Sequence, residues 1–133
     1  MRTLTHILDC SVQNYADNIA LSMKGANHQI SFTYRRLQEQ AIQLAKSLKA
    51  KGLARGDTIA LITPNTPIWG VIFFGVLYAG ATIVPIDTKL KAHSVKAILE
   101  HANCKWIFIS EDLKELLHDA LDGICINPNI IIF

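Results

Sequence analysis

From residue 58 onward, short β-branched or apolar runs alternate with helical patterns, and this alternation constrains the fold more than any other feature of the sequence. The runs lie at residues 58–62, 81–84, 105–109 and 130–133, and the helical patterns at 67–79, around 95–102 and after Ser110. A strand that returns to the same sheet through a helix makes a right-handed crossover. Repeated units of this kind predict an α/β fold: a mostly parallel sheet with helices on both faces.

The residues before this region predict two helices around a β-hairpin. Runs at 19–23 and 29–32 flank Gly25-Ala26-Asn27, which is typical of a hairpin turn. Thr3 or Thr5 would cap the first helix, and Thr33 the second, which ends at Gly52. The first helix has an apolar face formed by Leu4, Ile7, Leu8, Val12 and Tyr15, and the second a stripe of Leu37, Ala41, Leu44 and Leu48.

An uncharged segment at 68–86 would be long enough to cross a bilayer if it formed one helix. Gly80 is a natural helix end, however, and residues 81–84 then predict a buried strand that Pro85 ends. We therefore expect a helix, a turn and a strand, and no transmembrane segment. Further on, Ser110 would cap the last helix, whose first turn suits Glu111 and Asp112.

Composition places the chain among ordinary globular proteins. It has 133 residues, 50% hydrophobic and 18% charged, which allows one domain. A formal net charge of +2 is too small to indicate a nucleic-acid partner, and the basic residues between 35 and 55 predict a solvated helix face. The three cysteines are far apart in sequence, which predicts free thiols in a reducing, cytoplasmic compartment. The first residues lack the apolar run of a signal peptide.

Motifs that carry catalysis or phosphate binding are absent from the sequence. Neither glycine-rich phosphate loop occurs, and Gly52 and Gly56 lie between a helix and a strand, where a helix stop followed by a turn is expected. The five histidines have no metal-ligand spacing, and there is no nucleophile elbow. We assign no catalytic, cofactor-binding or metal-binding residue. An aromatic stripe of Trp69, Phe73, Phe74 and Tyr78 is typical of a core, and less often of an apolar ligand pocket.

Four segments resemble, in order and spacing, the characteristic blocks of adenylate-forming (AMP-binding) enzymes. They are Phe-Thr-Tyr-Arg-Arg-Leu at 32–37, Gly-Leu-Ala-Arg-Gly-Asp-Thr-Ile-Ala-Leu at 52–61, Pro-Asn-Thr-Pro-Ile-Trp at 64–69 and Leu-Tyr-Ala-Gly-Ala-Thr-Ile-Val-Pro-Ile-Asp at 77–87. Residues 1–133 are thus identified as the N-terminal part of an AMP-binding domain. Trp69 and the residues Tyr-Ala-Gly at 78–80 favour a resemblance to the long-chain fatty acyl-CoA synthetase branch of this family. Arg36 and Ile68 stand where the family usually has Glu, and Arg36 removes the reciprocal capping box with Thr33.

The resemblance implies an ATP-dependent ligase. Such an enzyme joins a fatty or other carboxylic acid to AMP and then transfers the acyl group to CoA, so ATP, Mg²⁺ and CoA are implied for the full-length enzyme. The family's phosphate loop, acidic motifs and catalytic lysine would lie beyond Phe133, so the isolated chain is expected to be inactive. We expect a cytoplasmic enzyme, and leave open a peripheral association of the full-length enzyme with membranes.

Two other interpretations stay open. One is a short protein that binds a partner or an acyl chain without catalysis. The other is an independent nucleotide-binding domain, which the missing glycine loop disfavours. The reading frame after Phe133 would separate a truncated ligase from a short protein. The uncharged run at 129–133 predicts self-association through an edge strand; acyl chain length, acceptor thiol and oligomeric state are not predicted.

Overall fold

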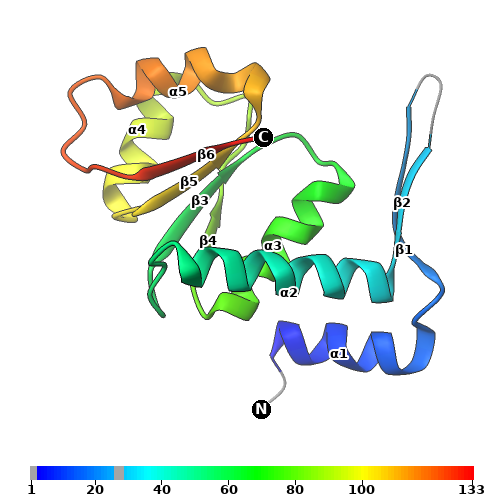
Figure 1. The fold of residues 1–133 in the computed structure, drawn as a ribbon. Coiled ribbons are helices and arrows are strands. Elements are labelled where there is room, and N and C mark those ends of the chain that lie inside the picture. Colours follow the sequence, from blue (N-terminus) through cyan, green and yellow to red (C-terminus); the bar gives the residue numbers. More distant parts are fainter. Residues whose placement is uncertain (1–2, 26–28) are drawn as a thin grey trace. The chain divides into compact units, whose positions relative to one another are not determined.

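The structure, a computed structural model, describes residues 3–25 and 29–133 (Figure 1). The chain divides into two compact units. The first combines Met1–Arg55 with Asn65–Gly80, and the second combines Gly56–Pro64 with Ala81–Phe133. Each unit has its own cluster of buried apolar side chains, and each is described by itself below.

The first unit contains three helices and a β-hairpin. Its elements are α1 (Leu4–Tyr15), β1 (Ile19–Lys24), β2 (Gln29–Thr33), α2 (Tyr34–Ala50) and α3 (Pro67–Ala79). The two strands pair antiparallel, with Ser22 opposite Ser31, which confirms the predicted hairpin. Residues 26–28 of its turn lie outside the described residues. Thr3 and Thr33 are the caps: each hydroxyl accepts a hydrogen bond from the amide three residues further along.

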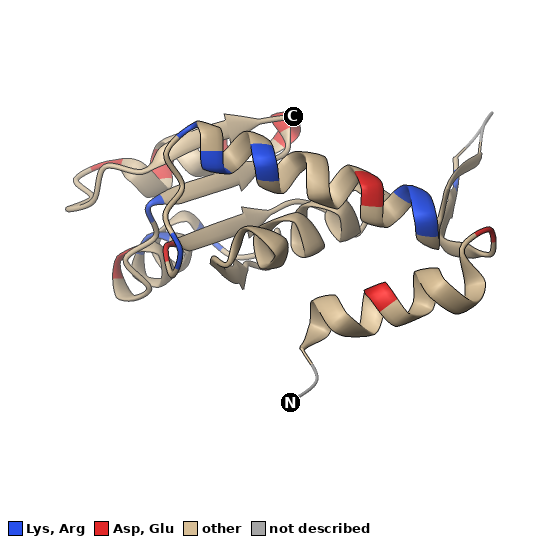
Figure 2. Ribbon diagram, turned by 60° about the horizontal axis from the view of Figure 1, so that its bottom comes forward, with Lys and Arg blue, Asp and Glu red and all other residues tan. Residues whose placement is uncertain are grey.

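The core of the first unit joins the hairpin to the helices. One cluster of its buried residues contains Leu8, Phe32, Leu37 and Val71. Helices α2 and α3 bury further residues, among them Leu48 and Val76. The apolar face predicted for α1 is only partly buried, because Leu4, Ile7 and Tyr15 are each more than half exposed. The basic residues of 35–55 are exposed, as predicted, and lie on α2 and just beyond it (Figure 2).

The second unit is built on a four-stranded parallel sheet in the order β4-β3-β5-β6. Its elements are β3 (Thr58–Ile62), β4 (Thr82–Pro85), α4 (Ala92–His101), β5 (Trp106–Ile109), the 3₁₀ turn η1 (Glu111–Leu113), α5 (Lys114–Leu121) and β6 (Asn129–Ile132). In the sheet, Ile59 lies between Ile83 and Trp106. This topology, with the separate hairpin, confirms the predicted α/β fold class.

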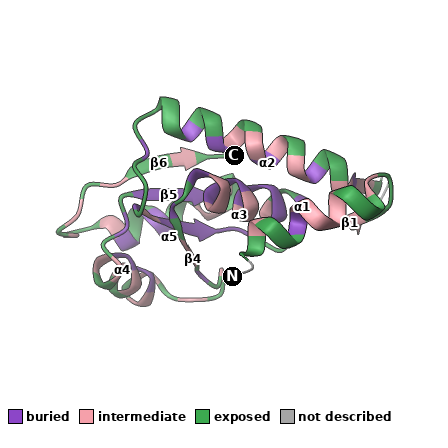
Figure 3. Cartoon of the chain, turned by 90° about the horizontal axis from the view of Figure 1, so that it is seen from below, coloured by how far each residue is buried: buried purple, intermediate pink, exposed green. Residues whose placement is uncertain are grey.

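The two central strands are buried on both faces, as their continuous apolar sequences predict (Figure 3). On one face, alternate residues of β3 and β5 pack against α4 and α5. The cluster contains Ala60, Ile62, Ile107 and Ile109 from the strands, Val95 and Leu99 from α4, and Leu117 and Ala120 from α5. Fully burying one such Ile or Leu side chain stabilises the fold by about 1.5–3 kcal/mol.

Between Pro67 and Pro85 the chain forms a helix, a turn and a strand. Gly80 has a left-handed φ of +80° and ends α3, as predicted. The prediction of a buried strand at 81–84 is wrong, however. The strand runs from Thr82 to Pro85, and both of these residues are exposed, because β4 has a neighbour on one side only. None of the helices in the described residues is both long and apolar enough to cross a bilayer.

The prediction that the Ser110 hydroxyl caps the last helix is also wrong. Ser110 precedes a 3₁₀ turn, and its carbonyl accepts from the amide of Leu113 at 3.0 Å. Its buried hydroxyl has no hydrogen-bond partner within the described residues. The tighter turn closes on the backbone carbonyl three residues back, so the Leu113 amide, which is the one three residues along, bonds to the Ser110 carbonyl and not to its hydroxyl.

Candidate ligand-binding site

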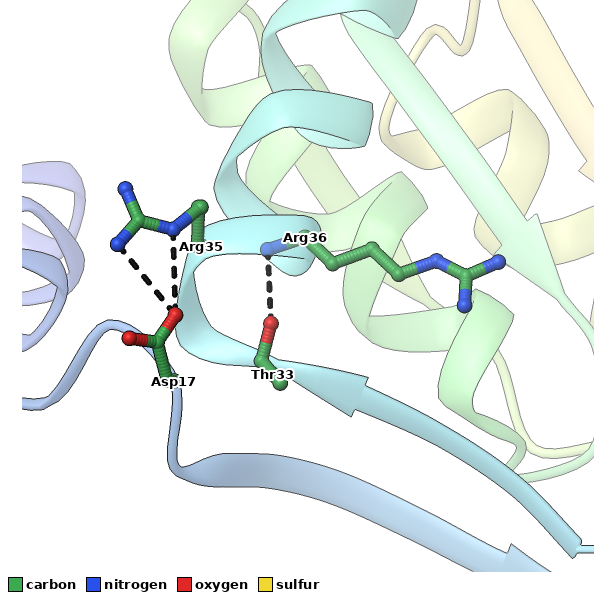
Figure 4. A network of polar contacts seen from close by, with 4 residues as sticks. All are labelled: Asp17, Thr33, Arg35 and Arg36. Carbon is green, nitrogen blue, oxygen red and sulfur yellow. Dashed lines mark hydrogen bonds and ion pairs between the residues drawn. The ribbon is translucent and has the colours of Figure 1, made fainter.

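The segment 32–37 joins β2 to α2, and its two arginines serve different contacts (Figure 4). Thr33 accepts the Arg36 amide at 3.2 Å, while the Arg35 guanidinium lies 3.4 Å from the carboxylate of Asp17. The Arg36 guanidinium carbon lies 4.9 Å from the centroid of the Phe32 ring. Arg36 thus makes a cation–π contact instead of the reciprocal cap that a glutamate would supply. These contacts are structural and supply no reactive group.

Asp57 lies at the amino end of the sheet, directly before β3. Its side chain is 8% exposed, and it accepts a hydrogen bond from the Lys105 ammonium at 2.7 Å. Lys105 directly precedes β5, so this pair joins the starts of two neighbouring strands. In open α/β sheets ligands bind at the carboxyl ends of strands. Asp57 therefore anchors the sheet and is not placed as a ligand group. Sequence analysis included it only as one residue of the family block at 52–61.

Gly70 brings α3 and the hairpin close together. A Cβ built on Gly70 would lie 2.5 Å from Cδ1 of Leu21 in β1, so a larger residue here would require the Leu21 side chain to move. The glycine therefore allows Leu21 to approach α3 without that rearrangement. This approach places one side of the hairpin beside the first turns of α3.

A groove of about 580 Å³ lies between β1 and the start of α3. Its lining residues are Leu21, Ser22, Met23, Asn65, Thr66, Pro67, Trp69, Gly70, Phe73 and Phe74. The rings of Trp69 and Phe73 are stacked, with centroids 5.0 Å apart and planes at 13°. Phe74 meets Phe73 edge to face at 5.4 Å. Three members of the predicted aromatic stripe thus line a groove, which was the less favoured of the two interpretations.

The lining of this groove has a simple chemical character. Among the described residues, its lining contains no charged side chain, and the lining side chains with polar atoms are Ser22, Asn65, Thr66 and Trp69. The Ser22 hydroxyl already accepts from the side-chain amide of Gln29 at 2.8 Å. The groove can therefore hold an apolar group, and it offers neither a general base nor a cation for phosphate.

Tyr78, the fourth aromatic residue of the stripe, belongs to a polar cluster instead. Its hydroxyl donates to the carboxylate of Asp9, which also accepts from Nε2 of Gln38 at 2.7 Å. Burial, followed by the hydrogen bond to Asp9, raises the pKa of Tyr78 to about 12. The phenol therefore stays neutral at physiological pH. Nothing local in the sequence indicates a cluster formed by residues so far apart.

The remaining reactive side chains do not form a site. Burial raises the pKa of the Cys104 thiol to about 11, so this cysteine is unreactive, and all three cysteines are free. Within residues 3–25 and 29–133, no three His, Cys, Asp or Glu side chains come close enough together to hold a metal ion.

Comparison with known proteins identifies the family. The AMP-binding enzyme family matches residues 8–131. The chain belongs to this family. It is 34% identical over 90 residues to a peroxisomal benzoate–CoA ligase of Arabidopsis thaliana, covering 68% of this chain and 16% of that protein. It is 31% identical over 93 residues to a peroxisomal butyrate–CoA ligase of the same plant, covering 70% and 16% respectively.

A solved structure shows the same fold. The benzoate CoA ligase from Burkholderia xenovorans LB400 has a TM-score of 0.84 at 23% sequence identity, and the match covers 100% of this chain and 26% of that chain. This AMP-binding family member thus resembles the N-terminal region of adenylate-forming acyl-CoA ligases. The chain spans about a sixth of the length of the two plant relatives. The two relatives are named for different acids, benzoate and butyrate. The match therefore does not select one carboxylate.

Proposed function

We propose that this chain is the N-terminal segment of an ATP-dependent acyl-CoA ligase. The enzyme would activate a carboxylic acid as an acyl-adenylate and then form a thioester with CoA. The family match over residues 8–131 carries this proposal. Because the chain spans 16% of each plant relative, the activity of the whole protein is part of the proposal.

In this proposal residues 1–133 supply scaffold and no catalytic group. The contacts of the family blocks support this role: the Thr33 cap, the Asp57–Lys105 pair and the helix end at Gly80 all position secondary structure. ATP, Mg²⁺ and CoA would be held by other parts of the full-length enzyme. The isolated chain would then have no ligase activity.

The acid and the compartment are the finer parts of the proposal. Trp69 and the Tyr-Ala-Gly wording at 78–80 favour a long-chain fatty acid as the substrate. The three free cysteines favour the reducing environment of the cytoplasm. Neither choice follows from the family match.

ATP–pyrophosphate exchange with benzoate, butyrate and palmitate tests the proposal. We would compare the longest gene product that contains these residues with the 133-residue chain alone. Exchange is expected only from the former, with the highest kcat/KM for palmitate. Exchange with none of a wide panel of acids would reject the ligase, and a preference for benzoate or butyrate would reject the long-chain acid. Exchange by the 133-residue chain alone would reject the purely structural role.

The groove favours a second candidate function, a non-catalytic module that binds an acyl chain. Its uncharged apolar lining and its volume of about 580 Å³ suit a flexible hydrocarbon chain. Trp69 lines the groove, whereas Trp106, the other tryptophan, is 6% exposed and lies in β5. Palmitate should therefore produce a saturable change in fluorescence that Trp69→Phe abolishes. A change that persists in Trp69→Phe, or no change in the original chain, would contradict this function.

A further inference from the structure

β6 forms one edge of the parallel sheet, and no strand lies beyond it in the part of the chain that the structure describes. It pairs with β5 from Asn129 opposite Trp106 to Ile132 opposite Ile109. The side chains of Ile130 and Ile132 are 42% and 46% exposed, and Phe133 next to them is 42% exposed. An edge of this kind presents unpaired backbone groups and apolar side chains together, which favours pairing with another strand.

The opposite edge of the same sheet, β4, is protected. Pro85 has no amide hydrogen, and the exposed charged residues Asp87 and Lys89 lie two and four residues beyond the end of the strand. By contrast, no charged side chain lies between Asp122 and Phe133, and β6, which ends at the C label, is tan in Figure 2. A further strand is therefore expected to pair with the β6 edge of the sheet and not with the β4 edge.

The hydrogen bonds to β5 define which backbone groups of β6 face outward. The amide of Asn129 donates to the carbonyl of Lys105 at 2.9 Å, and that of Phe133 to the carbonyl of Ile109 at 3.2 Å. Successive residues of a strand direct their backbone groups to alternate sides. The amides and carbonyls of Ile130 and Ile132 therefore point away from β5, and they line the free edge.

We propose that two copies of this chain associate by antiparallel pairing of β6 with β6 across a two-fold axis. A register centred on Ile131 places Ile130 opposite Ile132 of the second copy, and Ile132 opposite its Ile130. Each of these pairs exchanges two hydrogen bonds, so every outward backbone group of Ile130 and Ile132 is satisfied. The two four-stranded sheets would become one continuous sheet.

The sequence of β6 favours a second copy over an unrelated strand. In the two-fold register every cross-strand pair from 130 to 132 is Ile with Ile, and no like charges meet. A two-fold interface requires a patch that is complementary to itself, and this run meets that condition on both faces of the sheet.

Sedimentation velocity of the 133-residue chain over increasing concentration tests the association. Dimer is expected to accumulate with concentration. Ile130→Lys, which introduces a charge at the free edge, should raise the dissociation constant at least about tenfold, equivalent to about 1.4 kcal/mol. Thr82→Lys, at an exposed position on β4, is the matched control and should leave it unchanged. A chain that stays monomeric, a dimer that Ile130→Lys leaves intact, or equal weakening by both variants would overturn the proposal.

Disulfide formation tests the register with Ile→Cys variants, which introduce no charge into β6. In a background with Cys10→Ser and Cys125→Ser, Ile131→Cys should cross-link two copies, because a centred pair without mutual hydrogen bonds has Cα atoms about 4.5 Å apart. Ile130→Cys is the control: its equivalent in the second copy lies two residues along the strand, more than about 7 Å away. Cross-linking through Ile130→Cys alone would overturn the proposed register, and cross-linking through neither would overturn the pairing.

Discussion

The pair formed by Asp57 and Lys105 is asymmetric at the level of single residues. The lysine side chain is 60% exposed, whereas the carboxylate is 8% exposed. A second pair, Lys114 with Glu111, has the same separation of 2.7 Å, but its carboxylate is 76% exposed. Burial of the carboxylate is therefore the main difference between the two pairs. Losing one of its partners is costly for a buried carboxylate even where other contacts remain, whereas water hydrates an exposed one.

We predict that Lys105→Met destabilises the fold by about 1–3 kcal/mol, the usual penalty for removing a partner from a buried polar group. Lys114→Met, the matched control, should cause a much smaller loss, because water replaces the lysine around Glu111. The midpoint of urea unfolding, measured for both variants, checks the prediction. Equal losses would show that burial of Asp57 does not matter.

Tyr78 predicts a specific dependence of stability on alkaline pH. Its pKa is about 12 in the folded chain and near 10 when unfolded, so the folded chain holds the phenolic proton more tightly. The free energy of folding that this tighter proton binding contributes is fully present below pH 10, and it is lost as the pH rises towards 12. The urea midpoint should fall more steeply over this interval in the original chain than in Tyr78→Phe. Parallel curves for the two proteins would contradict the raised pKa of Tyr78 in the folded chain.

At the scale of elements, the end of α3 depends on one backbone conformation. Gly80 has φ of +80°, and its amide closes the last turn on Leu77 at 3.0 Å. A Cβ at this position would lie 3.3 Å from Cγ of Arg55, a side chain that can move. Backbone strain, more than steric contact, therefore restricts position 80 to glycine.

Gly80→Val should accordingly destabilise the fold by more than about 1 kcal/mol, because a β-branched residue strongly disfavours left-handed dihedrals. Gly80→Asn is the matched control, since asparagine enters this region more readily, and it should cost less than valine. Thermal or urea unfolding measures both. An unchanged midpoint for Gly80→Val would show that α3 does not end in this conformation.

Sequence analysis predicted best the helix boundaries that single residues in the sequence determine. Thr3 and Thr33 lie at helix caps, and Gly80 lies where a left-handed residue is needed, so each boundary follows from its own residues. β4 was wrongly predicted as buried, because burial depends on which strands become neighbours. The cap at Ser110 failed because a 3₁₀ turn and an α-helix can begin with the same residues.

At the scale of the whole molecule, the family blocks predict the fold, but not the candidate site. The groove combines residues 21–23 with 65–74, and the polar cluster combines Asp9, Gln38 and Tyr78. Such groups meet only through tertiary packing, so no spacing in the sequence indicates them. The aromatic stripe was visible as a pattern, yet a core and a pocket wall have the same helical spacing.

The absence of phosphate-binding chemistry leads to a prediction for the intact 133-residue chain. Nucleotide phosphates are held by backbone amides of a glycine-rich loop and by cations, and the sequence has no such loop. In the part of the chain that the structure describes, the groove lining contains no charged side chain, and the exposed basic residues of α2 are solvated. Calorimetric titration with ATP and Mg²⁺ should therefore detect no binding in the micromolar range. Micromolar affinity would contradict the structural role proposed for this chain, and would favour an independent nucleotide-binding domain whose phosphate site differs from the known glycine loops.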